Sequence, residues 1–300
     1  MTGTIQTGID LLPATGAEVK LLDGTYNIAT AIVPDSSQTL KGCGRNTILT
    51  ATTADLHIIQ CYGSSGSEKT GVLICDLCVD GNAGGETNDI GIDWYYVDNS
   101  IIRNCWVQDN GEEGIYLEDC DGNIISHNFC TGNTNDGIQA AICTNNTISI
   151  NVCQNNTRYG IYVNGNNTED KNTITANTCS GNSNGIYLCD SESDVVQSNI
   201  CTGNSESGII ATCGNHNCSF IANLSQDNGY YGIQLQSSNN MLVLGNTCTE
   251  NSQDATNTYD DILLSGVAYS MVTNNICRAG DETNKPRYGI NISDAACDTV

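Results

Sequence analysis

A group of carboxylates with catalytic potential lies between residues 93 and 119. It contains Asp93, Glu118 and Asp119, with Glu112 and Glu113 shortly before the last two. Two carboxyl groups held ~5 to 9 Å apart can hydrolyse a glycosidic bond, one as general acid and the other as nucleophile or base. We therefore take Asp93, Glu118 and Asp119 as candidate catalytic residues. Because the chain has 34 acidic residues, chance neighbours are also expected, and the hypothesis depends on the elements that position these three.

These acids belong to a repeat with a period of mostly 23 to 25 residues. A Gly-Ile-x-Leu segment, with some substitutions, begins at positions 91, 114, 137, 160, 185, 208, 232, 261 and 289. A second motif, Asn-x-Cys, begins at positions 128, 151, 177, 199, 246 and 275, and Asn223-Leu224-Ser225 takes its place in the remaining turn. A third register of apolar residues comes three residues before the asparagine or its equivalent: Ile102, Ile125, Ile148, Ile174, Val196, Ile221, Val243 and Val272. Each period thus holds three short apolar segments, which are too short and too β-branched for helices.

Three strands in each period predict an all-β fold, the parallel β-helix with a triangular coil. We expect the coils to cover residues 16–300, to be right-handed like other parallel crossovers, and to end in an incomplete coil. A short helix within residues 1–15 would cap the first coil, since Ile5, Ile9 and Leu12 share one helical face. Strand pleating should point Ile115 and Leu117 inward and the residue between them outward. The corner asparagines should form hydrogen-bonded ladders from coil to coil.

The beginning of the chain resembles pectate-lyase-like β-helix proteins. The resemblance rests on residues 16–28 (GAEVKLLDGTYNI), on residues 39–44 (TLKGCG) and on the coils that follow. Similar repeats occur in polysaccharide lyases, C5-epimerases, copper-site-assembly periplasmic proteins and phage tailspikes, so the resemblance implies the fold and leaves the function open. The sequence lacks the Arg-x-Pro-x-x-Arg, Gly-His-Gly and Asp-Pro-His signatures of the enzymes among them. Asp260-Asp261 lacks the Arg-x-Lys that follows such a pair in polygalacturonases, so it receives no catalytic role.

The outward position of the Gly-Ile-x-Leu strand presents one side chain in each coil. Aromatic rings and amides at the coil spacing can stack on a sugar chain and hydrogen-bond to it, although both are also ordinary on a β-surface. The candidate substrate-binding residues are Tyr116, Gln139, Tyr162, Tyr187, Gln234 and Tyr259. Longer segments at 82–91, 251–261 and 280–289 should protrude and frame a shallow cleft beside this face. We expect the three histidines, His57, His127 and His216, to be isolated surface or corner residues.

The cysteine pattern indicates packing. Six of the 17 cysteines share one column, in which Val79 and Val107 fill the earlier places: Cys130, Cys153, Cys179, Cys201, Cys248 and Cys277. Because valine replaces cysteine there, we expect free, buried thiols that act as small apolar side chains. No cofactor is required by the sequence and no metal site is assigned. Asp119-Cys120-Asp121-Gly122-Asn123 has oxygen ligands at a spacing that suits Ca²⁺, although turns use the same residue types.

Charge restricts the partners. The net charge of −24 repels phosphate backbones and anionic membranes, so we exclude nucleic acid and membrane insertion. The sequence shows no signal peptide or apolar run of ~18 residues, which leaves the localisation open and fits synthesis in the cytosol followed by display on a virion or cell surface. A polysaccharide or glycan surface is the expected partner, and a homotrimer or an additional C-terminal domain would cover the last coil.

Three functions are compatible with the sequence. The leading hypothesis is a carbohydrate-binding or adhesion β-helix of a virion tail or cell-surface assembly. The second is a polysaccharide-degrading enzyme, a hydrolase or lyase with carboxylates on the outer face. The third is a structural spacer, for which the regular repeat is sufficient.

Overall fold

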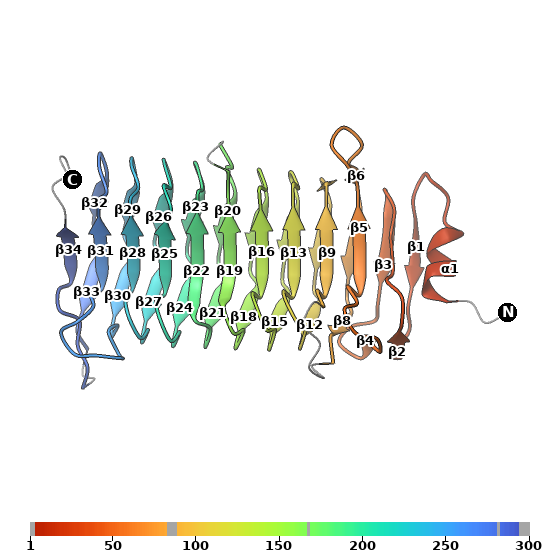
Figure 1. Ribbon diagram of the computed structural model, residues 1–300, viewed down its shortest axis with the longest axis horizontal. Coiled ribbons are helices and arrows are strands. Elements are labelled where there is room, and N and C mark those ends of the chain that lie inside the picture. The colour runs from red at the N-terminus through yellow and green to blue at the C-terminus, as the bar shows by residue number, and fades with distance from the viewer. Residues whose placement is uncertain (1–3, 83–88, 167–168, 281–282, 294–300) are drawn as a thin grey trace. The chain divides into compact units, whose positions relative to one another are not determined.

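The chain folds into parallel β-helical coils, as the repeat predicted (Figure 1). The structure, a computed structural model, describes residues 4–82, 89–166, 169–280 and 283–293. The chain divides into two compact units, Met1–Val152 and Cys153–Val300. In each unit the strands of successive coils pair in parallel within three sheets, A, B and C. Side chains at equivalent places in successive coils therefore form columns.

The first unit contains the helix and the first coils. The helix α1 (Ile5–Asp10) is followed in sheet A by β1 (Ala17–Lys20), β3 (Gln38–Lys41), β7 (Leu73–Cys75), β11 (Ile101–Arg103), β14 (Ile124–Ser126) and β17 (Thr147–Ser149). Sheet B has β2 (Gly24–Ile28), β4 (Thr47–Ala51), β8 (Cys78–Asp80), β12 (Trp106–Gln108) and β15 (Phe129–Thr131), and β18 (Val152–Gln154) spans the unit boundary. Sheet C has β5 (Ile59–Tyr62), β9 (Ile92–Tyr95), β13 (Ile115–Glu118) and β16 (Ile138–Ala141). A separate parallel pair joins β6 (Lys69–Thr70) and β10 (Val97–Asp98).

The second unit repeats the three sheets. Sheet A has β20 (Thr173–Thr175), β23 (Val195–Gln197), β26 (Ser219–Ile221), β29 (Leu242–Leu244) and β32 (Met271–Thr273). Sheet B has β21 (Thr178–Ser180), β24 (Ile200–Thr202), β27 (Leu224–Gln226), β30 (Thr247–Thr249) and β33 (Ile276–Arg278). Sheet C has β19 (Tyr159–Asn164), β22 (Asn184–Cys189), β25 (Ile209–Thr212), β28 (Ile233–Gln236), β31 (Ile262–Ser265) and β34 (Ile290–Ser293).

The interior follows the predicted alternation, with one correction. Ile115 and Leu117 are fully buried, and Tyr116 between them is only half-buried. In sheet A of the second unit, however, Phe220 and not Ile221 pairs with Val196 and is fully buried. The assignment of Ile221 to the inner column was wrong because Phe220 is the residue three positions before the corner asparagine. Pleating then turns Ile221 outward.

Asparagine ladders hold the corners, as predicted. The side-chain oxygen of Asn223 accepts from the backbone N–H of Asn199 at 3.0 Å and from its side-chain nitrogen at 3.1 Å, and the same nitrogen donates to the carbonyl of Ile174 at 2.9 Å. Asn128 makes the equivalent bonds in the first unit, to Asn151 and to Ile102. These bonds satisfy backbone groups that leave the sheets at each turn.

The cap helix is short and anchored by one buried side chain. The hydroxyl of Thr4 caps it by accepting from the backbone N–H of Thr7 at 3.1 Å. Ile9 is buried, whereas Leu11 is 79% exposed. Figure 1 places α1 beside β1 in the first unit. The predicted incomplete last coil falls on residues 294–300, and the predicted long segments fall partly on 83–88 and 281–282, all outside the described residues.

None of the cysteines in the described part of the chain forms a disulfide bond. In the second unit the strand register aligns Cys179 with Cys201 and Cys248 with Cys277, and Ser225 occupies the place between Cys201 and Cys248 in this column. Burial raises the pKa of Cys201 and Cys248 well above the usual thiol value, so these thiols are inert packing groups.

Thiol labelling of the native protein should therefore be selective. We expect Cys43 and Cys213, which are exposed, to react within minutes with a maleimide at pH 7. Cys179, Cys201 and Cys248 should react only after unfolding, because labelling requires access to the thiol and all three are buried. Peptide mass spectrometry at timed intervals measures this order. Rapid native labelling of Cys201 would contradict the buried column.

Candidate active site on sheet C

Asp93 is surrounded by hydrogen-bond donors from the preceding coil. The strand register pairs it with Gln60 of β5 and with Tyr116 of β13. It faces out of the coil but is only 4% exposed. The Nδ1 atom of His57 lies 2.6 Å from its Oδ2 atom, and the Tyr62 hydroxyl donates to the same oxygen. Asp93 is therefore a buried carboxylate with two side-chain partners.

His57 belongs to this site, so the expectation that it is isolated was wrong. It lies two residues before β5 and its side chain is 25% exposed. The hydrogen bond to Asp93 raises its pKa, burial opposes the rise, and the charges of Glu112 and Asp89 add to it. Because Nδ1 is held by Asp93, proton exchange with a substrate falls to Nε2.

The raised pKa of His57 gives a direct test of this contact. In an NMR titration, the imidazole of His57 should titrate above the usual value of about 6.5. The Asp93→Asn variant should lower that pKa, because the largest cause of the rise is removed. The folded state binds this proton more tightly than the unfolded chain, so the stabilisation is full below about pH 6.5 and is lost as pH rises through the folded pKa. Unchanged titration in Asp93→Asn would contradict the pairing.

The next two coils continue a polar surface beside Asp93. The Tyr116 hydroxyl donates to Oε2 of Glu118 at 2.9 Å, and burial, together with that bond, raises the pKa of Tyr116. With its amide turned so that the nitrogen faces the two carboxylates, Gln139 donates to Glu113 Oε1 at 3.2 Å and to Asp136 Oδ2 at 3.1 Å. These contacts fix the orientation of each side chain along the outer face of sheet C.

The structure separates the three predicted catalytic acids by environment. Glu118 lies two residues after Tyr116 in β13 and is in register with Tyr95, which lies two residues after Asp93 in β9, so both acids point to the outer side of the sheet. Asp119 lies at the corner after β13 with a left-handed backbone (φ 52°) and interacts with Tyr96. Asp93 and Glu118 therefore share one face of sheet C, while Asp119 turns to the next corner.

The arrangement can perform acid–base chemistry. A histidine oriented by a buried carboxylate is a suitable proton donor or acceptor. Asp93 already holds His57 and Tyr62, so its role is to orient His57, and Glu118 lies on the same outer face in the next coil. Burial also raises the pKa of Tyr62, so this phenol stays protonated at neutral pH.

The Gly-Ile-x-Leu repeat in the sequence begins at residue 91, so the pattern does not reach His57 and Tyr62. One coil earlier, Ile59 pairs with Ile92 at a separation of 33 residues, whereas Ile92 and Ile115 are 23 apart. The signal that could have revealed them is the alternation of buried Ile59 and Cys61 around Gln60, which continues the inner column of the later coils across a longer coil. The other two histidines are corner residues, as expected. His127 has a left-handed backbone (φ 57°). The backbone of His216 forms isolated parallel β-bridges with Glu192 and Asn239 at the same corner of the neighbouring coils.

In the second unit, predicted sugar-binding tyrosines form aromatic clusters. Tyr162 and Tyr187 are in register, with ring centroids 5.4 Å apart, and Tyr159 stacks on Tyr187 at 4.6 Å. The guanidinium of Arg158 lies 4.6 Å from the Tyr159 ring. The Tyr187 hydroxyl hydrogen-bonds to Thr212 at 2.7 Å. This cluster forms a half-buried aromatic surface.

The two remaining predicted residues lie farther along the second unit. Gln234 is half-buried and lies in register with Leu263. Tyr259 stacks on Tyr230 at 4.4 Å. Asp260, next to it, is fully buried and forms a two-point ion pair with Arg287, at 3.1 and 2.8 Å. This acid therefore has a cationic partner 27 residues further along the chain, outside the Arg-x-Lys pattern.

In the segment with the spacing that suits Ca²⁺, residues 119–123, polar side chains form hydrogen bonds within the protein. The Asp121 carboxylate accepts from Thr144 at 2.6 Å and from Asn145 at 2.7 Å, and Asn123 donates to the carbonyl of Val97 at 2.7 Å. Within the described part of the chain, no three His, Cys, Asp or Glu side chains are grouped to hold a metal ion. The same part of the chain contains no helix long and apolar enough to span a membrane.

Solved structures with the same architecture include enzymes and phage proteins. The A-module of the mannuronan C-5 epimerase AlgE4 from Azotobacter vinelandii matches with a TM-score of 0.86 and 19% identity, over 98% of this chain and 87% of that chain. The DFA-IIIase from Arthrobacter chlorophenolicus A6, crystallised with GF2, matches with a TM-score of 0.74 and 15% identity, over 94% and 82%. The Dettilon tailspike protein matches with a TM-score of 0.65 and 15% identity, over 93% and 62%.

Sequence comparison gives the family. The sequence matches none of the curated proteins with which it was compared. The family described as the right-handed β-helix region matches residues 48–225 and 168–300, which together cover most of the chain and include His57, Asp93 and Glu118. The chain therefore belongs to the family of right-handed β-helix proteins.

Proposed function

We propose that this protein binds a polysaccharide along sheet C of its first unit and hydrolyses it by acid–base chemistry at His57. The single observation that carries the proposal is the 2.6 Å contact between His57 Nδ1 and the buried carboxylate of Asp93. The asparagine ladders and the apolar columns already hold the coil together, so the stability of the fold does not require such a pair.

Each group has a chemical role in the proposal. The raised pKa of His57 keeps its proton available near neutral pH, so His57 Nε2 donates to the leaving glycosidic oxygen. The Glu118 carboxylate, held by Tyr116, activates water or stabilises the developing positive charge on the sugar. Asp93 is a positioning residue that holds the imidazole and compensates its charge. The polysaccharide-active enzymes among the structural neighbours are compatible with this assignment.

A reducing-end assay on a panel of neutral and uronic polysaccharides tests the proposal. We expect the wild-type protein to release reducing ends from at least one glycan, and the His57→Asn variant to lose at least about 100-fold of that rate. His127→Asn is the matched control, because asparagine tolerates the left-handed backbone at that corner. No release from any glycan, or full activity in His57→Asn, would overturn the proposal.

Binding without chemistry is the second candidate, and the aromatic cluster of Tyr159, Tyr162 and Tyr187 favours it. Such rings supply a large contact area to the apolar face of a sugar. On this proposal the protein adheres to a glycan, as a virion or cell-surface component would. Glycan binding that is weakened by Tyr162→Ala, with all glycans left intact, would select this function.

A further inference from the structure

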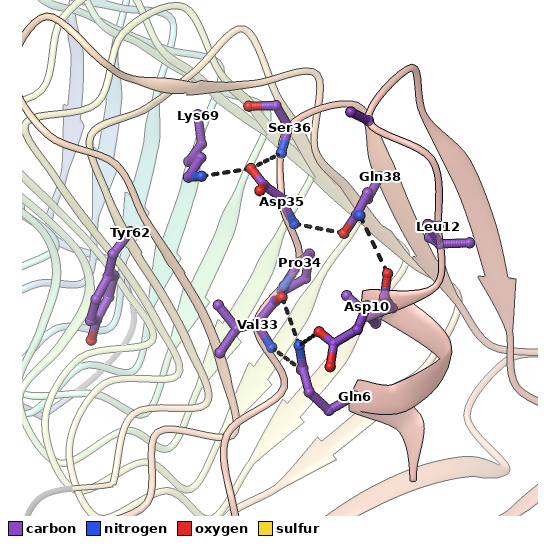
Figure 2. A pocket seen from close by; sticks show the side chains of 12 residues that line it. Gln6, Asp10, Leu12, Val33, Pro34, Asp35, Ser36, Gln38, Tyr62 and Lys69 are labelled. Atoms are coloured by element: carbon purple, nitrogen blue, oxygen red, sulfur yellow. Dashed lines mark hydrogen bonds and ion pairs between the residues drawn. The ribbon is translucent and has the colours of Figure 1, made fainter. Parts of the chain in front are cut away.

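A pocket of about 500 Å³ lies between α1 and the coil that follows it. Figure 2 shows Gln6 and Asp10 of α1 on one side, Tyr62 and Lys69 on the other, and the segment 33–38 between them. Ile9 and Pro34 are buried and supply apolar wall. The lining therefore combines apolar surface with charged and amide groups, the composition that suits a small polar ligand.

The pocket adjoins the proposed active site through Tyr62. This side chain lines the pocket and is 44% exposed, and its hydroxyl donates to Asp93. A ligand against the Tyr62 ring would thus lie one side chain away from His57. The two sites can accommodate different sugar units of one polysaccharide chain.

The polar groups of the pocket are held in place by their neighbours. Lys69 Nζ pairs with Asp35 Oδ1 at 2.6 Å. The backbone N–H of Asp35 donates to the buried Gln38 at 2.7 Å. The Gln6 nitrogen donates to Asp10 Oδ1 at 2.7 Å, and its oxygen accepts from the Val33 N–H at 2.7 Å. An ammonium group has three donors and a carboxylate has two oxygens, so Lys69, Asp35 and Asp10 retain hydrogen-bonding capacity for ligand hydroxyls.

The charge of the pocket selects among sugars. Lys69 contributes one positive charge, whereas Asp10 and Asp35 contribute two negative charges. The hydrogen bond from Lys69 lowers the pKa of Asp35, so this carboxylate is ionised at neutral pH. A uronate would therefore meet net repulsion here, within a chain of net charge −24.

We propose that this pocket is a subsite for a neutral sugar residue of the same polysaccharide, one or more residues away from the bond that reacts at His57. The proposal rests on the proposed function. Hydroxyls of the sugar bond to Asp35, Asp10 and Lys69, and one face of its ring packs against Tyr62. The enzyme consequently prefers neutral glycans that are long enough to fill both sites.

The test measures, by calorimetry, the binding of two series of oligosaccharides of increasing length to the His57→Asn protein. One series is prepared from a neutral and the other from a uronic polysaccharide of the panel. Adding Asp35→Asn or Lys69→Met should weaken binding of the longer oligosaccharides at least tenfold and leave the shortest binder unchanged. Lys171→Met is the matched control, because it breaks a lysine–glutamate pair in the second unit. The melting temperature of each variant verifies folding, and Lys69→Arg, which keeps the ion pair, should retain most of the affinity.

The outcomes separate the two proposals. If the Asp35 and Lys69 variants bound oligosaccharides of every length as tightly as the His57→Asn protein does, the subsite proposal would be overturned and the proposal of hydrolysis at His57 would stand. Tighter binding of uronic than of neutral oligosaccharides would overturn the neutral-sugar assignment. A wild-type protein that neither cleaves nor binds any glycan would overturn both.

Discussion

Asp93→Asn is expected to lower the turnover number about 100-fold or more while changing the Michaelis constant little. The amide can still occupy the space of the carboxylate, but it removes the negative charge that keeps His57 protonated and oriented. General acid–base contributions of this kind amount to roughly 10²- to 10⁴-fold. The alkaline limb of the pH–rate profile should move to lower pH, since the pKa of His57 falls.

The pH profile distinguishes a positioning role from a merely structural one. A structural defect lowers activity at every pH, whereas loss of the Asp93 carboxylate shifts the profile. Glu118→Gln provides the comparison: it should reduce turnover without moving the limb that belongs to His57. If Asp93→Asn left both turnover and the pH profile unchanged, Asp93 would have no part in the reaction.

Asp194→Asn is expected to stabilise the protein by about 2 to 4 kcal/mol above pH 7. Asp194 is fully buried, and its Oδ1 accepts from the Asn172 N–H at 2.6 Å. Its Oδ2 has no hydrogen-bond partner among the described residues. At a comparable corner of the first unit, Asn146 donates from its side-chain nitrogen to the carbonyl of Cys120. A carboxylate cannot make that donation, but asparagine can.

The effect should depend on pH in a defined direction. Burial raises the pKa of Asp194 from 3.8 to about 7, so the folded state binds this proton more tightly than the unfolded chain. The destabilisation is absent below about pH 4, grows as pH rises to about 7, and is constant above that. Each pKa unit corresponds to about 1.4 kcal/mol, which sets the upper end of the expected gain.

Urea unfolding of the wild type and of Asp194→Asn at pH 5 and pH 8 measures this difference. The gain should be larger at pH 8. Asp190→Asn is the matched control, since Asp190 is half-exposed and has a left-handed backbone that asparagine tolerates (φ 51°). Its effect should stay within about 0.5 kcal/mol. An equal gain at both pH values would mean that ionisation of Asp194 is not the cause.

The sequence alone determined the coil and its columns. A period close to 23 residues, three short β-branched segments and a corner asparagine in each period leave few ways to bury the apolar residues other than stacked coils. The spacing rule also explains the misplaced Ile221. The inner residue lies three positions before the corner asparagine, and Phe220, not Ile221, has that spacing to Asn223. Columns are readable from sequence because each member repeats at a nearly constant interval.

The tertiary structure decided the candidate active site and the pocket beside it. His57 and Asp93 are 36 residues apart and belong to coils of unequal length, so no periodic pattern joins them. Tyr62 reaches Asp93 from the same longer coil, and the pocket forms only where the cap helix meets the segment 33–38. Packing columns obey the period because every coil must fill the same interior. The functional side chains lie where the coils depart from it, and their partners are set by folding.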